Sequence, residues 1–210
     1  MARALQMRRA VAMRLTRGFT LVELMIVVVI VGILATLAVV GYRQIVQSSH
    51  VSEATSMVQN IRAAQEAYHS ETQQYAGVSQ CIPNGLTGGW YPQDPVYQVE
   101  VGWGAPYSAS SGTCGSVTGV PWTSLPVHVD GPVLFGYACI AGVAGAGPSS
   151  TQIPQSNITV NGAPLTFPST PPTEWYVISA VADLDGNTAN YTQIWADSWT
   201  NQVFVSNEGL

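Results

Sequence analysis

The stretch of sequence that decides the fold is residues 17–42, which read RGFTLVELMIVVVIVGILATLAVVGY. Fifteen of the seventeen residues from Leu24 to Val40 are apolar, and no charged residue follows until Arg43. A helix needs about 20 mostly apolar residues to cross a bilayer. The sequence therefore predicts a transmembrane helix over residues 19–42.

Charge is distributed unevenly between the two ends of the chain. The first 18 residues contain five arginines and no acidic residue, whereas the remainder contains two arginines and twelve acidic residues, a net charge of −10. A basic segment before an apolar run stays on the cytoplasmic side of the membrane by the positive-inside rule. The remainder has no basic residue after Arg62 to neutralise phosphates, so we expect no direct binding of nucleic acid.

Two ordinary kinds of N-terminal segment explain residues 1–42 only in part. A secretory signal peptide has a short apolar core and then a cleavage site, but this apolar run is too long and nothing loop-like follows Tyr42. A plain membrane anchor explains the length but leaves Glu23 unexplained, because a carboxylate at the membrane edge costs a few kcal/mol on insertion scales. An acidic residue in such a place favours a functional role.

A partner for Glu23 appears if the chain is cut between Gly18 and Phe19. The new α-amino group then lies four residues before the carboxylate. The amine and the carboxylate can approach each other within one helix, or the carboxylate of one subunit can neutralise the amine of its neighbour. A slipped subunit would leave two charges unpaired in apolar surroundings, so this pairing favours a defined axial register during assembly.

Residues 17–25, RGFTLVELM, resemble the class III signal of type IV prepilins and pseudopilins. The resemblance implies that a membrane peptidase removes residues 1–18 on the cytoplasmic side, cutting between Gly18 and Phe19, and N-methylates Phe19. It also implies that Glu23 is the assembly carboxylate. The expected partners are other pilin subunits, the prepilin peptidase and methyltransferase, and the inner-membrane pilus assembly machinery. One departure is that many members have a proline near Val40, whereas Gly41 follows Val40 here.

The predicted helix continues beyond the membrane. No proline occurs between Phe19 and Pro83, which favours one helix from Phe19 to about Gln73. Residues 43–75 form its amphipathic continuation, with an apolar stripe interrupted at Gln65. The stripe consists of Val51, Ala54, Val58, Ile61 and Tyr68.

Residues 76–210 are predicted to form a β-rich head domain. The strand candidates are Val96–Val101, Val133–Ala141, Glu174–Ala182, Ala189–Ala196 and Gln202–Ser206. The fold class is therefore α+β, with a long N-terminal helix packed on a four- to five-stranded antiparallel sheet. The pilin fold implied by the resemblance has this same architecture.

The three cysteines all lie in the predicted head domain. In an oxidising compartment two of them are expected to pair, and the sequence does not determine which. Cys139 lies within the apolar run 134–140, which is typical of a buried thiol. We therefore favour a disulfide between Cys81 and Cys114.

Asp183, Asp185 and Asn187 suggest a calcium site, because alternating oxygen side chains around a glycine suit a hard cation. The resemblance adds that related pseudopilins bind calcium in this region. However, the run lacks the glycine and glutamate of an EF-hand loop, since Thr188 and Ile194 occupy those positions. A hairpin turn at an Asp-Gly pair is the commoner explanation, and no other cofactor is expected.

The function we expect is that of a structural subunit of a type IV pilus-like filament that serves motility, adhesion or surface attachment. The subunit would pass once through the inner membrane with its head domain in the periplasm, and would be extracellular after assembly. One alternative is a pseudopilin of a type II secretion or DNA-uptake system. Another is a membrane-tethered enzyme or binding module with a prepilin signal, but the sequence contains few charges and no Gly-x-Ser-x-Gly, Walker, Rossmann or HExxH pattern.

Overall fold

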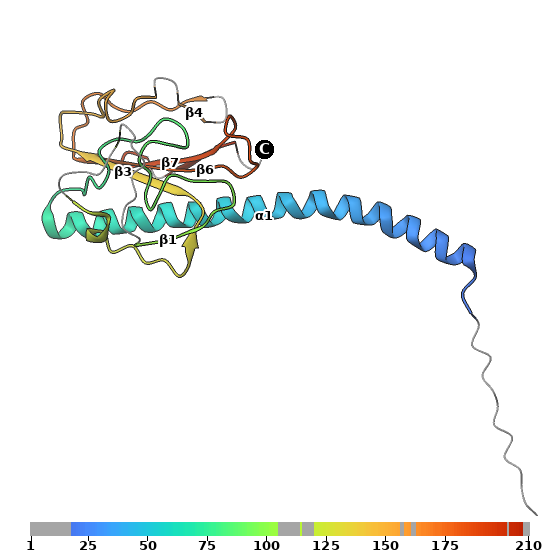
Figure 1. Ribbon diagram of the computed structural model, residues 1–210. Coiled ribbons are helices and arrows are strands. Elements are labelled where there is room, and N and C mark those ends of the chain that lie inside the picture. The colour runs from blue at the N-terminus through green and yellow to red at the C-terminus, as the bar shows by residue number, and fades with distance from the viewer. Residues whose placement is uncertain are drawn as a thin grey trace, which may run out of the picture. The chain divides into compact units, whose positions relative to one another are not determined.

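The computed structural model describes residues 18–104, 114, 120–155, 158–160, 163–200 and 202–207. The predicted leader therefore lies outside the described residues, apart from Gly18. The chain divides into two compact units, Met1–Tyr42 and Arg43–Leu210, and we call the second unit the head domain. Helix α1 (Leu21–Thr72) contributes residues to both units, which confirms the prediction of one long helix (Figure 1).

Helix α1 ends where the backbone turns into the left-handed region. Gln73 has a φ of 58°, and its N–H donates a 2.8 Å hydrogen bond to the carbonyl of His69. A residue in this conformation just after the last turn closes the helix and satisfies one of its terminal carbonyls. The helix was predicted to end at about Gln73, although glycine is the more usual residue in this left-handed position.

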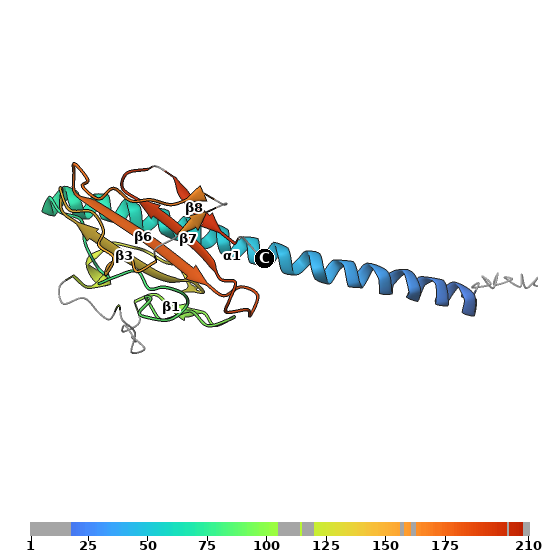
Figure 2. The same cartoon turned by 90° about the horizontal axis from the view of Figure 1, so that it is seen from above.

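The main sheet of the head domain is antiparallel and has the strand order β3-β6-β7-β8 (Figure 2). Its strands are β3 (Gly136–Gly142), β6 (Trp175–Ala182), β7 (Thr192–Asp197) and β8 (Val203–Ser206). Shorter elements are β1 (Val101–Gly102) paired with β2 (Pro132–Val133), β4 (Thr159–Val160) paired with β5 (Ala163–Pro164), and the 3₁₀ helix η1 (Trp122–Ser124). The antiparallel sheet and the helix confirm the predicted α+β class.

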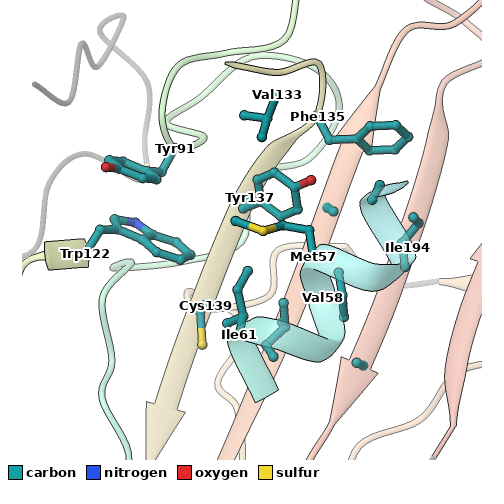
Figure 3. Close-up of a cluster of buried hydrophobic side chains, with 14 of the residues drawn as sticks. Met57, Val58, Ile61, Tyr91, Trp122, Val133, Phe135, Tyr137, Cys139 and Ile194 are labelled. Carbon is teal, nitrogen blue, oxygen red and sulfur yellow. The ribbon is translucent and has the colours of Figure 1, made fainter. Parts of the chain in front are cut away.

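One face of the main sheet packs on α1. Ile178 and Tyr176 of β6 belong to the same buried cluster as Val58 and Ile61 of α1. Figure 3 shows Val58 and Ile61 directed toward the sheet, near Ile194 of β7. Each such side chain stabilises the fold by about 1.5–3 kcal/mol when it is fully buried, so the apolar stripe read from the sequence is core packing.

The opposite face of the sheet is also covered. Alternate residues of β6, including Trp175 and Val177, belong to a second buried cluster with Trp195 of β7. Loop residues complete this cluster, among them Ile82 and Ile153. Every residue of β6 is buried, and in Figure 1 the sheet lies between α1 and a layer of loops that carries β4. The head domain is therefore built in three layers.

The predicted strand Val96–Val101 is wrong. Only Val101 belongs to a strand, and the N–H of Val99 donates a 3.0 Å hydrogen bond to the carbonyl of Val96. Gln98, between them, has a φ of 56°. The segment is a tight turn in which Val96 and Val99 are exposed. Branched residues favour strands only where a neighbouring strand and a buried surface are available.

The other strand predictions hold with shifted boundaries. Glu174–Ala182 and Gln202–Ser206 correspond to β6 and β8 within one residue. The candidate Val133–Ala141 divides into β2 and β3, which belong to different sheets. Strand β7 begins at Thr192, three residues later than predicted, because the preceding residues form the turn between β6 and β7.

Candidate assembly site at the start of helix α1

Thr20 and Glu23 form a reciprocal pair at the N-terminus of α1. The Thr20 N–H and hydroxyl donate hydrogen bonds of 2.9 and 2.8 Å to Oε2 of Glu23. In return, the Glu23 N–H donates a 3.2 Å bond to the Thr20 hydroxyl oxygen. This is a capping box, in which the N-cap residue and the third helical residue satisfy each other's backbone N–H groups.

The capping box gives the carboxylate of Glu23 a local role that the sequence analysis missed. The signal was present, since a threonine followed three residues later by a glutamate before an apolar run is typical of a helix start. The bonds bring the carboxylate beside the Thr20 N–H, one residue from the Phe19 nitrogen. Oε1 of Glu23 has no hydrogen-bond partner among the described residues.

Gly18 and Phe19 precede the helix, lie outside any helix or strand and are exposed to solvent. The Phe19 side chain is 85% exposed, and a Cβ added at Gly18 would meet nothing within 4 Å. The structure therefore places these two residues and Glu23 within one short segment. It tests neither cleavage nor methylation, which stay predictions.

The first half of α1 presents an apolar surface on all sides. From Leu21 to Val40 every large hydrophobic side chain is more than half exposed. The polar hydroxyl of Thr36 donates to the Ile33 carbonyl at 2.7 Å, so it is satisfied within the helix. Among the described residues, α1 is the one helix long and apolar enough to cross a membrane. Such a surface requires lipid or other subunits to cover it.

The structure links Cys81 to Cys114, with Cα atoms 5.0 Å apart. Cys139 is a free thiol in β3 and is completely buried. Burial raises its pKa to about 12, although the Nε2 of Gln65, 3.1 Å from the sulfur, opposes this shift by hydrogen bonding. Because the thiolate is the reactive form, Cys139 is inert in the folded head domain.

The residues considered for calcium lie in the turn between β6 and β7. Oδ1 of Asp183 accepts the Gly186 N–H at 2.7 Å, and Oδ1 of Asp185 accepts the Asn187 N–H at 2.8 Å. Oδ1 of Asn187 in turn accepts the Ala189 N–H at 3.2 Å. The described residues contain no group of three or more acidic, histidine or cysteine side chains arranged to hold a metal ion. The observed bonds are those of turn chemistry, and calcium binding stays untested.

Comparison with known proteins matches residues 13–39 to the family model described as the prokaryotic N-terminal methylation motif. The matched range contains Gly18, Phe19, Thr20 and Glu23, so the capping box lies within the motif. No solved structure gives a significant match to the chain.

Curated relatives match over short stretches. The chain is 43% identical over 60 residues to the type IV major pilin protein PilA of Myxococcus xanthus, covering 29% of this chain and 27% of the relative. It is 44% identical over 55 residues to the fimbrial protein EcpC of Eikenella corrodens, covering 26% and 36%. It is 46% identical over 48 residues to the type IV major fimbrial protein FimA of Dichelobacter nodosus, covering 23% and 30%.

These matches span about a quarter to a third of the length of the relatives. They agree with the features at the start of α1, which combines an exposed glycine and phenylalanine, a capped carboxylate and an uncovered apolar helix. The chain therefore carries the N-terminal methylation motif of prepilins and is similar to type IV pilins and fimbrial proteins.

Proposed function

We propose that this chain is a non-enzymatic structural subunit of a type IV pilus-like filament. The observation that carries the proposal is the uncovered apolar half of α1, which begins at a carboxylate held against the helix N-terminus. Membrane lipid would cover this surface before assembly and the helices of other subunits would cover it afterwards. The head domain would be periplasmic at first and extracellular in the filament.

Processing would precede assembly. A prepilin peptidase would cut between Gly18 and Phe19 and N-methylate the new amine, and inner-membrane machinery would then extract the subunit. Support comes from the exposure of both residues and their position outside any helix or strand, since a protease needs an accessible backbone. The methylation motif covers this site, and the relatives named above are major pilins and fimbrial proteins.

Glu23 would serve two purposes in succession. Before cleavage it caps the helix by accepting the Thr20 N–H. After cleavage its second carboxylate oxygen is available to the amine at Phe19, either of its own chain or of a neighbour. A charge pair in apolar surroundings is costly to break, because each separated charge would lose its compensation. Subunits would therefore add in the register that keeps the pair together.

The test compares Glu23→Gln with Glu23→Ala in cells that produce the filament. A glutamine at this position preserves the capping box but carries no charge. If the charge sets assembly, both variants will be inserted and processed normally, and both will enter filaments poorly. Electron microscopy of surface filaments, with mass spectrometry of their subunits, measures incorporation and the modification of Phe19.

Two further results would overturn parts of the proposal. Full incorporation of Glu23→Gln, with loss only in Glu23→Ala, would assign Glu23 to helix capping alone. A mature N-terminus at Phe19 in a Gly18→Arg variant would contradict the cleavage assignment. Thr20→Ser serves as the matched control, since it retains the capping oxygen and is expected to assemble normally.

A further inference from the structure

A polar groove opens on the loop-covered side of the main sheet, within the head domain. Its volume is about 360 Å³, which lies within the usual range of about 300–1,000 Å³ for small-molecule sites. The lining includes four carboxamide side chains, one of them on β7, together with a hydroxyl and an aromatic ring. The residues that matter here are Asn84, Gln155, Thr159, Tyr191, Gln193 and Asn207.

The floor of the groove is unusual for this face of the sheet. Most inward side chains here are apolar, such as Trp175 and Trp195, yet Gln193 of β7 is buried at 6% exposure. Its Nε2 donates a 3.1 Å hydrogen bond to the hydroxyl of Ser179, which is itself fully buried. The carboxamide oxygen and the second N–H have no partner among the described residues. This oxygen is not among the fully buried unpartnered atoms of the described residues, so it is open to the groove, where a ligand can reach it.

One wall of the groove is held in place by its own cross-links. Nε2 of Gln155 donates to the Pro83 carbonyl at 3.0 Å, and the Ile82 N–H donates to the Gln152 carbonyl at 2.8 Å. The disulfide at Cys81 anchors the same loop three residues before Asn84. The Asn84 side chain is exposed and has no hydrogen-bond partner among the described residues.

The other wall comes from the ends of β7 and β8. Nδ2 of Asn207 donates to the Tyr191 carbonyl at 3.2 Å, and the Thr192 hydroxyl donates to the Asn207 carbonyl at 2.7 Å. Tyr191 is half-buried, and its phenol has no partner among the described residues. Both walls are therefore ordered before any ligand arrives, which reduces the entropy lost on binding.

From this arrangement we infer that the groove binds a neutral, hydroxyl-rich ligand, namely an uncharged glycan. A carboxamide offers donors and an acceptor together, and each sugar hydroxyl likewise donates and accepts. The Tyr191 ring can pack against the apolar face of a sugar. Among the described residues, no charged side chain lines the groove. An ionic ligand would therefore lose its hydration without gaining an opposite charge.

A neutral peptide is the competing ligand, because its backbone also both donates and accepts. Peptide grooves gain specificity from apolar pockets for side chains, whereas this lining is mostly polar. The glycan is therefore favoured. The inference does not depend on polymerisation, since every lining residue belongs to the head domain.

The test uses the full-length chain in amine-oxide detergent micelles, because a sugar detergent would compete for the groove. Labelled protein is applied to an array of neutral oligosaccharides, with sialylated and sulfated glycans and neutral peptides alongside. The best neutral oligosaccharide is then titrated against wild type, Asn84→Ala, Tyr191→Ala and Gln193→Leu. Each of these variants should weaken binding about fivefold or more, the effect of one lost hydrogen bond.

Matched controls are Asn60→Ala, which lies exposed on α1, and Tyr97→Ala, which lies outside the lining. Both should bind as wild type does. Near-ultraviolet circular dichroism checks that each variant is folded, and Asn84→Ala and Tyr191→Ala carry the test if Gln193→Leu is not. Absence of neutral-glycan binding, preference for anionic glycans or peptides, or equal binding by Asn84→Ala and Asn60→Ala would each overturn the inference.

Discussion

The side chain of Gln65 binds the backbone of Ala76 at both polar groups. Its Nε2 donates to the Ala76 carbonyl at 2.7 Å, and its Oε1 accepts the Ala76 N–H at 2.8 Å. Gln65 interrupts the apolar stripe of α1 and is completely buried. It therefore joins the helix to the chain segment that leaves it, in the way that one strand pairs with another.

Replacing Gln65 by leucine should destabilise the head domain by about 2 kcal/mol or more, because two buried backbone groups of Ala76 would lose their partners. Urea unfolding of the full-length chain in micelles, followed by tryptophan fluorescence, measures the change. Gln59→Leu is the matched control, since Gln59 is exposed on the same helix. Equal stability of the two variants would show that the Gln65 pairing contributes little.

Replacing Thr20 by valine should loosen the start of α1, because valine keeps the shape of threonine but cannot accept the Glu23 N–H. Amide hydrogen exchange of residues 21–24 should become about fivefold faster, the effect of a typical lost N-cap. Thr20→Ser should exchange at the wild-type rate. Unchanged exchange in Thr20→Val would show that the apolar helix needs no cap.

Removing the disulfide by the double substitution Cys81→Ser and Cys114→Ser should lower the free energy of unfolding by about 2–4 kcal/mol. The link spans a sequence separation of 33 residues and anchors the loop beside Asn84. Thermal unfolding of oxidised wild type and of the double variant measures the change. In oxidised wild type, a thiol assay should detect one free cysteine per chain, and only after denaturation, because Cys139 is buried.

Stability should fall as the pH rises above 9, because burial raises the pKa of the Cys139 thiol from 9.0 to about 12. The folded state then holds a proton that the unfolded state has lost. Between pH 9 and about pH 12, deprotonation of this thiol in the unfolded state lowers the free energy of unfolding by about 1.4 kcal/mol per pH unit. Tyr176 adds to the loss only above pH 10, since burial raises its pKa from 10.0 to about 12.

Urea unfolding at pH 9 and pH 10 measures this dependence. Cys139→Ala should show a shallower decline than wild type, even though the substitution also lowers stability at neutral pH. Parallel declines for the two proteins would mean that the Cys139 proton is not linked to folding.

Gly142→Ala should destabilise the head domain by about 1–3 kcal/mol, the usual effect of overpacking. A Cβ at this position of β3 would overlap the ring of Trp175, whose Nε1 donates to the Ala146 carbonyl at 2.7 Å. The control is Gly131→Ala, where a Cβ meets nothing within 4 Å. Thermal unfolding should separate these two variants, and identical midpoints would contradict the predicted overlap.

The extent of α1 and the residues at its start could be predicted from sequence because both depend on local interactions. A helix needs only its own backbone bonds and an uninterrupted run of suitable residues. Thr20 and Glu23 are three residues apart, so their capping box is a property of that segment alone. The strands β6 and β8 could also be recognised, since their apolar residues lie between turn residues.

The turn at Val96–Val99 shows where a local sequence pattern fails to predict secondary structure. Its valines satisfy the composition of a strand, but Val96 and Val99 form a bridge with each other and the turn remains exposed. Whether such a segment pairs with another strand depends on what lies beside it in the folded chain. The second buried cluster was missed for the same reason, because its loop residues have no periodic pattern.

The sequence by itself determined the long apolar helix, its capped start and the N-terminal methylation motif, because these depend on residues a few positions apart. The tertiary structure alone decided that loops cover the second face of the sheet and that Gln65 meets Ala76. It also brought Asn84, Gln193 and Asn207 to one groove. These arrangements join distant segments, and their positions follow from packing, which no local pattern specifies.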